Sequence, residues 1–329
     1  LSLIQVVEVS RARTADEVAD LIGYRLPQVM VATPLKEGIV LGIGYVTNFM
    51  GRADFSYPKT GEEVPLYYEV YRHRGSLFTI PLSLSVKVQD WLNISAAYEL
   101  ERGSIKNDVR IEFYDQEYAD SESSRDRNYS GSSWSAAVMI RVHPRIYIGG
   151  QWDHEVDYDV NETITYSRSD FDSASVWNMS LPSAFGVGLA VGITDRWWLS
   201  SQYWMREAPG TSGFQQLAGG IRDETMIGVG LERRLGREGG FFGRIPIRFG
   251  FYQNQWHLEA PRGEAIVSRF FTAGTGFGLP NRPGSIDFSI EFGQIGSVDS
   301  NSADERMIRI GIGLSMSEVW SGRDEGSRR

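Results

Sequence analysis

The sequence predicts an all-β protein, an antiparallel transmembrane β-barrel of about 14 strands. Apolar and polar residues alternate with a period of two through most of the chain, which is the signature of strands with unlike faces. The polar face holds mainly glycine, serine and charged side chains, which suit a wet lumen better than a protein core. Short and long connections also alternate, as expected when one rim of a barrel carries tight turns.

The clearest alternation lies in a C-terminal hairpin at residues 284–320. Its apolar side holds Ile286, Phe288, Ile290, Phe292, Ile308, Ile310, Ile312, Leu314 and Met316. Glycine, serine and charged residues fill the other side. The polar stretch 298–303 predicts the turn, and the resulting register would place Glu291 directly or diagonally opposite Arg309 on the lumen face.

Other stretches predict the rest of the wall and its connections. Strands are expected near residues 1–12, 26–33, 39–46, 77–88, 93–101, 134–143, 146–165, 185–193, 197–205, 226–235, 245–252 and 270–279. Residues 14–17 resemble a helix start and predict a short loop helix. The polar stretches 116–128 and 167–175 are expected to be external loops.

Composition excludes several classes of protein. The chain has 329 residues, a formal charge of −9 and no cysteine, so disulfide frameworks and thiolate metal sites are excluded. The acidic balance argues against nucleic acid as a partner. Asp153, His154 and Glu155 are metal-ligand types, but neighbours in a strand point to opposite faces. We therefore predict no metal site and no cofactor.

Several large apolar side chains fall on the face that alternation assigns to the lumen. They are Met139, Trp198, Trp204, Met226, Tyr252 and Phe270. Aromatic and thioether groups suit apolar cargo of varied shape, so these residues are candidate ligand contacts. The alternative is that they fill the lumen or belong to an aromatic girdle at a rim.

Charged residues also fall on the lumen face, among them Arg141, Arg248, Glu291 and Arg309. A self-neutralising network across strands is the favoured interpretation. The alternative is that Arg141 or Arg248 binds the carboxylate of a fatty acid.

Alternation becomes blurred at Asn48, Phe49, Met50 and Gly51, at the end of a regular strand. A glycine inside a strand often marks a bulge, so we expect a kink in the wall there. The alternative is that the strand has left the bilayer for a loop.

Two parts of the sequence resemble the long-chain fatty-acid transporter (FadL) family of outer-membrane barrels. One is the run Leu26-Pro27-Gln28-Val29, with Pro34-Leu35 and Gly42-Ile43-Gly44-Tyr45. The other is the ending Asp287-Phe288-Ser289-Ile290-Glu291-Phe292-Gly293, with Arg309-Ile310-Gly311-Ile312-Gly313-Leu314-Ser315 and Trp320. The resemblance implies a 14-stranded barrel, a kinked strand, and a lumen-plugging hatch with Asn-Pro-Ala. That tripeptide does not occur here. We expect a barrel over residues 1–320 and a polar periplasmic tail at 321–329, with the hatch upstream or absent.

The resemblance also implies a function, a channel of the Gram-negative outer membrane for hydrophobic compounds such as long-chain fatty acids. Its surroundings would be membrane lipid and lipopolysaccharide, its cargo a hydrophobic small molecule, and the kink a candidate lateral exit. Protein partners in the envelope are a further expectation. The alternatives are a non-specific diffusion porin and a structural barrel subunit of an envelope assembly. An outer-membrane lipid hydrolase is disfavoured because no Gly-x-Ser-x-Gly occurs, and we predict no enzymatic activity.

Overall fold

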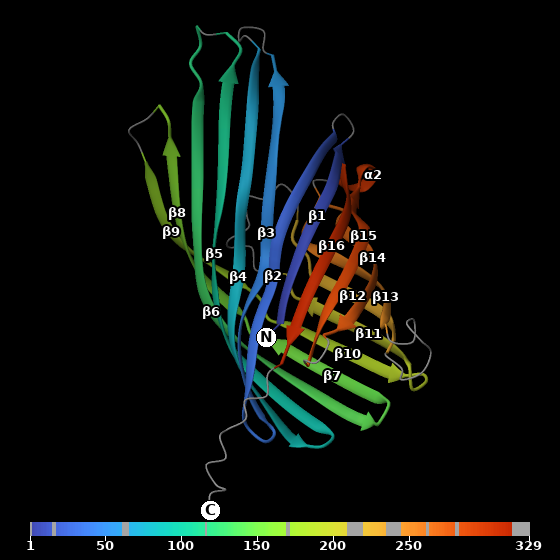
Figure 1. Cartoon of the computed structure of the whole chain (residues 1–329). Coiled ribbons are helices and arrows are strands. Elements are labelled where there is room, and N and C mark those ends of the chain that lie inside the picture. Colours follow the sequence, from blue (N-terminus) through green and yellow to red (C-terminus); the bar gives the residue numbers. More distant parts are fainter. Residues whose placement is uncertain are drawn as a thin grey trace, which may run out of the picture.

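The structure, a computed structural model, describes residues 2–14, 18–60, 66–115, 117–168, 172–208, 220–234, 245–260, 263–279 and 283–317. Within these residues, sixteen strands form one antiparallel sheet that closes on itself. Figure 1 shows the sheet wound into a barrel, with several strands rising far beyond one rim. The predicted all-β barrel is therefore confirmed.

The strands follow one another around the wall almost in chain order. They are β1 (Ser2–Thr14), β2 (Val18–Lys36), β3 (Ile39–Lys59), β4 (Tyr67–Gln89), β5 (Leu92–Phe113), β6 (Ser121–His143), β7 (Ile146–Asp153), β8 (Val156–Tyr166), β9 (Ser173–Leu181), β10 (Ala184–Gly192), β11 (Trp197–Arg206), β12 (Glu224–Arg233), β13 (Ile247–Glu259), β14 (Ala265–Gly278), β15 (Gly284–Ser297) and β16 (Ala303–Met316). β7 and β8 are two segments of one long strand, and so are β9 and β10. Counted that way, the described wall has the fourteen strands that the sequence predicts.

The barrel closes where its first strand pairs with its last. β1 pairs with β16, from Ser2 opposite Ser315 to Thr14 opposite Ala303. β6 pairs with β5 along one edge, while its other edge pairs with β7 in the lower half and with β8 in the upper half. The wall then continues from β7 to β10. Among the described residues, no helix has the length and apolarity needed to cross a membrane.

The C-terminal hairpin has the predicted strands and register. Ile290 lies opposite Ile310, and Glu291 lies opposite Arg309. The expected turn at 298–303 contains one helical turn, α2 (Val298–Asn301). The Ser297 hydroxyl accepts a hydrogen bond from the Ser300 amide and caps this helix, as an N-cap serine commonly does.

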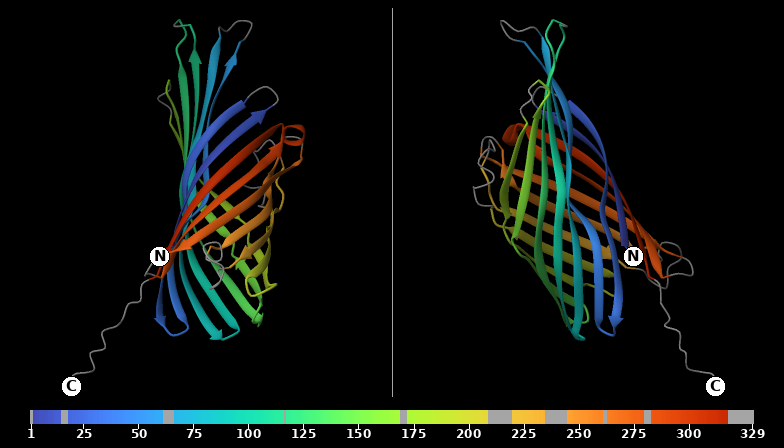
Figure 2. Two further views of the ribbon diagram at one scale, coloured as in Figure 1. Left: turned by 45° about the vertical axis from the view of Figure 1, so that its right-hand side comes forward. Right: turned by 90° about the vertical axis from the view of Figure 1, so that its left-hand side faces the viewer.

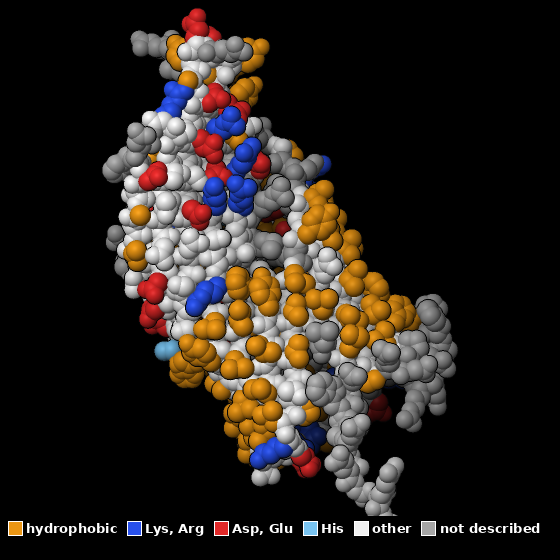
Figure 3. Space-filling model, turned by 60° about the vertical axis from the view of Figure 1, so that its left-hand side comes forward, with side chains coloured by type: hydrophobic (Ala, Val, Ile, Leu, Met, Phe, Trp, Pro, Cys, Tyr) orange, Lys and Arg blue, Asp and Glu red, His pale blue; other side chains and the backbone are white. Residues whose placement is uncertain are grey.

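Apolar side chains cover the outside of the barrel. Ile310 is 52% exposed and Phe271 is 53% exposed, and Figure 3 shows such side chains gathered over the lower half of one face. The outward apolar residues of β16 run from Ile308 to Met316. At about 3.3 Å per residue and a tilt of about 40°, they cover a height on the order of 20 Å, close to the apolar band of a membrane barrel. This surface therefore faces lipid.

Six strands rise above the barrel and form an upright curved sheet, which we call the fin (Figure 2). It comprises residues 47–59 of β3, 67–77 of β4, 102–113 of β5, 121–133 of β6, and all of β8 and β9. Its concave face carries its own apolar core of Tyr129, Val156, Tyr158 and Val160, and Val160 is 0% exposed. The fin is thus a packed extension of the wall on the long-loop side.

The two external loops expected at residues 116–128 and 167–175 were wrong in part. Residues 121–128 and 173–175 belong to strands β6 and β9 instead of external loops. Both faces of the fin contain polar groups, so apolar and polar residues do not alternate there. Cross-strand ion pairs, such as that of Arg127 Nε with Glu162 Oε2 at 2.5 Å, stabilise the charged strand. Of the helix start expected at residues 14–17, residues 15–17 lie outside the described part; strand β1 ends at Thr14 and strand β2 begins at Val18. The proposed tail, 321–329, and Trp320 lie outside it too.

The assignment of faces makes a direct prediction for two neighbouring residues of β10. Leu189 points outward and is 42% exposed, whereas Gly188 faces the lumen. Gly188 has room for a side chain, because the nearest atom to an added Cβ would be the Ser201 carbonyl oxygen, at 3.6 Å. We expect Leu189→Arg to destabilise the inserted barrel by about 2–4 kcal/mol if it lies near the bilayer midplane. Gly188→Arg should cost much less. Urea unfolding from lipid bilayers measures both, and equal losses would contradict the assignment of faces.

Candidate functional site

The hydrogen-bonded wall is interrupted between β2 and β3. Their shared ladder ends where Gln28 lies opposite Val46. Above that point the described part of β2 pairs only with β1, and β3 only with β4. We call this unpaired stretch, between residues 18–27 and 47–59, the split. Figure 3 shows a hollow in the surface beside the fin, above the apolar band.

Both strands change register where they separate. The β3–β4 ladder shifts between Thr47 and Phe49, so Asn48 is an extra residue, and the β1–β2 ladder shifts between Ile4 and Val6. Pro27 follows Leu26 at this level and has no backbone N–H to donate to a neighbouring strand. The Thr47 hydroxyl instead donates to the Leu26 carbonyl oxygen at 2.9 Å. The segment expected to be kinked therefore contains a bulge at the base of the split.

Behind the bulge, four side chains form a polar cluster on the lumen side. The Asn48 amide nitrogen donates to Thr79 Oγ1 at 2.6 Å and to Glu101 Oε2 at 3.0 Å. The Thr79 hydroxyl donates to Glu101 Oε1 at 2.8 Å, and the Tyr158 hydroxyl donates to Oε2 at 3.4 Å. Glu101 is only 4% exposed, so this cluster fixes the bulge to β4, β5 and β8.

The residues after Asn48 are packed closely on the same wall. Phe49 is 38% exposed, and its ring lies 6.3 Å from that of His73 in an edge-on contact. A Cβ atom added at Gly51 would lie 2.6 Å from Phe49 Cζ and 2.7 Å from His73 Nε2. Glycine therefore leaves room for these two rings at the edge of the split. The side chain of Met50 lies outside the described part.

The structure places four of the six candidate ligand residues in two cross-strand pairs. Trp204 and Met226 lie opposite each other on β11 and β12. Tyr252 and Phe270 lie opposite each other on β13 and β14, with ring centroids 5.2 Å apart and nearly parallel planes. The other two lie elsewhere. Trp198 is six residues from Trp204 toward the short-turn rim, under Arg234 at 3.9 Å, and Met139 is on β6.

Not all of these four can contact a cargo. Phe270 is 2% exposed because the Arg309 guanidinium covers its ring, with Cζ 4.5 Å from the ring centroid. Phe270 therefore packs against Tyr252 and Arg309 and does not line the lumen cavity. The alternation of residues along a strand shows which face a side chain is on, but not which other side chain covers it. The burial of Phe270 could therefore not be predicted.

Three of the four candidate lumen charges, Arg248, Glu291 and Arg309, belong to ion-pair networks across strands. Arg309 contacts Glu8 at 2.7 Å, Glu291 at 3.5 Å and the Tyr252 hydroxyl at 3.1 Å. Arg248 contacts Asp287 at 2.8 Å and Glu232 at 3.2 Å. Glu8 was not among the expected partners, because it comes from the far end of the chain. Arg141 has no carboxylate within ion-pair distance among the described residues.

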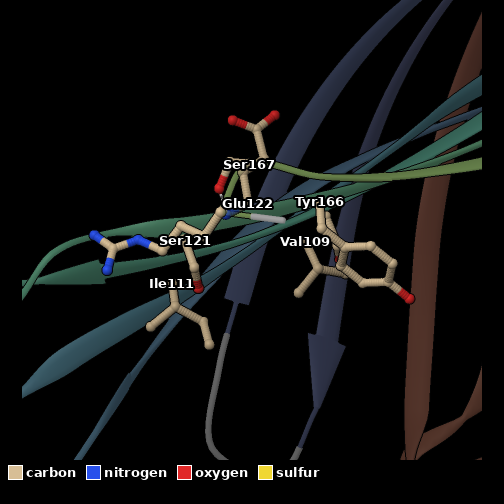
Figure 4. A pocket seen from close by; sticks show the side chains of 8 residues that line it. Val109, Ile111, Ser121, Glu122, Tyr166 and Ser167 are labelled. Carbon is tan, nitrogen blue, oxygen red and sulfur yellow. Dashed lines mark hydrogen bonds between the residues drawn. The ribbon is translucent and has the colours of Figure 1, made fainter. Parts of the chain in front are cut away.

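Two cavities accompany these features. One, of about 370 Å³, lies along the lumen wall against Gln202, Gly228, Gly230, Arg248, Gly250 and Tyr252. Inward glycines make this space, as their pattern in the sequence suggests. The other, of about 580 Å³, lies at the tip of the fin, where Val109, Ile111 and Tyr166 form an apolar side and Ser121 lies beside them (Figure 4). No pattern in the sequence indicated this second cavity.

Comparisons with known proteins agree with this architecture. A family model named BamG matches residues 22–324. The chain belongs to the BamG family. No curated protein matches the sequence.

Solved structures of outer-membrane transporters share the fold of this BamG-family chain. A FadL homologue of Pseudomonas aeruginosa has a TM-score of 0.67 and 11% identity, over 95% of this chain and 88% of its own. The toluene transporter TbuX of Ralstonia pickettii has a TM-score of 0.61 and 13% identity, over 97% and 89%. The toluene transporter TodX of Pseudomonas putida has a TM-score of 0.61 and 10% identity, over 96% and 90%. At these identities the likeness establishes the barrel fold.

The polar cluster behind the split predicts how the bulge responds to substitution. Glu101→Leu would leave the Thr79 hydroxyl and the Asn48 amide without their acceptor in a buried place, and should destabilise the protein by about 1–3 kcal/mol. Glu101→Gln keeps an acceptor of the same shape and should lose less. Urea unfolding measures both losses, and hydrogen exchange at residues 46–52 reports on the bulge. Faster exchange in Glu101→Gln than in Glu101→Leu would contradict this role.

Proposed function

We propose that the protein is a bacterial outer-membrane channel for the uptake of hydrophobic small molecules, such as long-chain fatty acids. The observation that carries the proposal is the split between β2 and β3, with bulges in the ladders on both sides of it. A closed barrel has no free strand edge, so an interrupted ladder beside the lumen is a natural place for lateral passage. The shared fold with the toluene transporters supports the proposal without deciding the cargo.

Lateral exit suits an apolar molecule on energetic grounds. Leaving a polar lumen for water gains little, whereas entering lipid recovers about 25 cal/mol per Å² of apolar surface. In this proposal Trp204, Met226 and Tyr252 contact the cargo in the lumen, and Asn48, Phe49 and Gly51 border the way out. Tyr252 lines the lumen cavity of about 370 Å³, which supports its place in that set.

A diffusion porin is less well supported. A porin needs a wide water-filled lumen inside a continuous wall. The described lumen wall carries arginines that are mostly neutralised by carboxylates, as at Arg248 and Arg309, and its ladder is interrupted at the split.

A reversible clamp across the split tests the proposal. The chain has no cysteine, so Leu26→Cys with Thr47→Cys introduces a single pair, at positions already linked by the hydrogen bond of 2.9 Å. We expect oxidation to lower uptake of a fluorescent long-chain fatty acid by whole cells at least fivefold, and reduction to restore it.

The matched control places the same crosslink where the strands are already paired. Val31→Cys with Ile43→Cys joins residues opposite each other in the β2–β3 ladder, and should leave uptake unchanged. Unaltered uptake with the Leu26–Thr47 clamp fully formed would overturn lateral exit.

A second function, as the barrel subunit of an envelope assembly, is favoured by the free edge of the fin. In the described part, β9 pairs only with β8, and its nine residues include no charged residue and no proline. Natural edge strands are usually protected against pairing by charges, prolines or bulges. The free edge of β3 along the split has such protection in Asp54, Pro58 and Lys59. The β9 edge is therefore suited to accept an extended segment of another protein.

This second function predicts an effect of charge at the β9 edge. Val176→Lys, at a side chain 72% exposed, should release the protein from any larger assembly without affecting insertion. Native gels of mild-detergent extracts would show the change in size, and Asp54→Lys on the protected edge is the control. Extracts in which the wild-type protein runs as an isolated barrel would count against an assembly subunit.

A further inference from the structure

A row of arginine and glutamine residues crosses the outside of the barrel on five neighbouring strands. Its members, in order from β13 to β1, are Gln253, Arg269, Gln294, Arg306 and Arg11. Each lies directly opposite the next in the strand register. We call this row the arginine belt. Figure 2 shows β14, β15, β16 and β1 side by side on one wall.

The belt lies immediately above the lipid-facing surface. A row made only of apolar side chains lies next to the belt, two residues along each strand toward the short-turn rim. That row comprises Phe251, Phe271, Phe292, Ile308 and Val9, again opposite one another in register. Phe271 stacks on Phe292 at 5.7 Å and packs on Phe251 at 5.0 Å. The belt is thus the first polar row on the long-loop side, at the level of the lipid head groups of the outer leaflet.

The charges of the belt are not balanced within it. Arg306 lies opposite Arg11, an arrangement of like charges that is unfavourable between neighbouring strands. Arg306 is exposed, and within the described residues it makes no hydrogen bond or ion pair. Arg269 donates to Gln253 Oε1 at 2.9 Å and contacts no carboxylate in the described part.

Two acidic residues lie next to the belt in the strand register. Asp20 lies opposite Arg11 at one end. Asp304, two residues above Arg306, is 4% exposed and is bound by Arg13 Nε at 3.0 Å and by Gln294 Nε2 at 3.1 Å. The fin differs, because Arg74, above the apolar residues of β4, is paired with Asp108 at 3.1 Å. The unneutralised cations are therefore concentrated at Arg269 and Arg306.

We propose that the arginine belt binds the phosphate groups of a phosphorylated glycolipid of the outer leaflet, of the lipid A type. Guanidinium groups bind phosphate oxygens through paired, charge-assisted hydrogen bonds. A phosphate at Arg306 would supply the counter-charge that this side chain lacks among the described residues. The acyl chains of the same molecule would lie on the phenylalanine row directly below, which is the reason for assigning a lipid and not free phosphate.

Native mass spectrometry of the full chain in detergent tests the assignment. The probes are hexa-acylated bis-phosphorylated lipid A, the same lipid without phosphates, and inorganic phosphate. We expect Arg269→Gln with Arg306→Gln to weaken binding of the phosphorylated lipid at least tenfold. Binding of the dephosphorylated lipid should be weak in all variants and unchanged by the substitutions.

Two variants control for charge and for folding. Arg72→Gln with Arg110→Gln removes two arginines from the fin and should alter binding less than twofold. Arg269→Lys with Arg306→Lys keeps both charges and should retain more binding than the glutamine pair. Equal losses in the belt and fin variants, or in the lysine and glutamine variants, would overturn the assignment. Displacement of the lipid by an equal concentration of inorganic phosphate would overturn it too, in favour of a free-phosphate site.

Discussion

Backbone pairing inside a bilayer is the constraint on which this structure depends. No water reaches peptide groups at membrane depth, so each must be paired within the protein, and a sheet achieves this only by closing on itself. The ladders from β1 to β16 satisfy that demand over most of the apolar band. The free edge of β9 lies toward the long-loop side, where water or protein can complete the pairing. The split between β2 and β3 begins lower, below the level of Val9 in the apolar row, so its lower end lies within the apolar band.

Much of the barrel could be predicted from sequence because lipid and lumen impose opposite demands on alternate residues. Ile308, Ile310 and Ile312 face outward, whereas Arg309 and Gly311 face inward, and the register follows from that pattern. The fin could not be predicted in the same way. Both of its faces contain polar groups, and the strand assignment of residues 121–128 depends on partners such as Glu162, which is distant in the sequence.

The bulge at Asn48 shows how an irregular pattern can still be informative. Before it, even-numbered residues such as Gly42 and Gly44 face the lumen; after it, odd-numbered residues such as Phe49 and Gly51 do. The inserted residue exchanges the two faces, which is why alternation is blurred there. The contacts of Asn48 with Thr79 and Glu101 could not be foreseen, because they depend on three strands meeting at one height.

The same limit applies to the lumen residues. Alternation along the strands placed Tyr252, Phe270, Glu291 and Arg309 on one face, and the structure joins them into one cluster. Alternation could not show that Phe270 would be covered or that Glu8 would form the shorter ion pair with Arg309. Both outcomes follow from ring closure, which brings β1 beside β16.

Ring closure also has a consequence for the order of folding. The ladder between β1 and β16 joins residues about 300 positions apart, as in the contact of Arg309 with Glu8, so it is among the most non-local contacts in the chain. Bringing such distant segments together carries the largest loop-closure entropy and slows folding. Until β16 is in place, β1 and the growing end of the sheet each present an unpaired edge, and such edges promote pairing with other chains. The nascent barrel is therefore most exposed to misassembly just before its last strand pairs, and a companion that covers the edge of β1 would protect it for that interval.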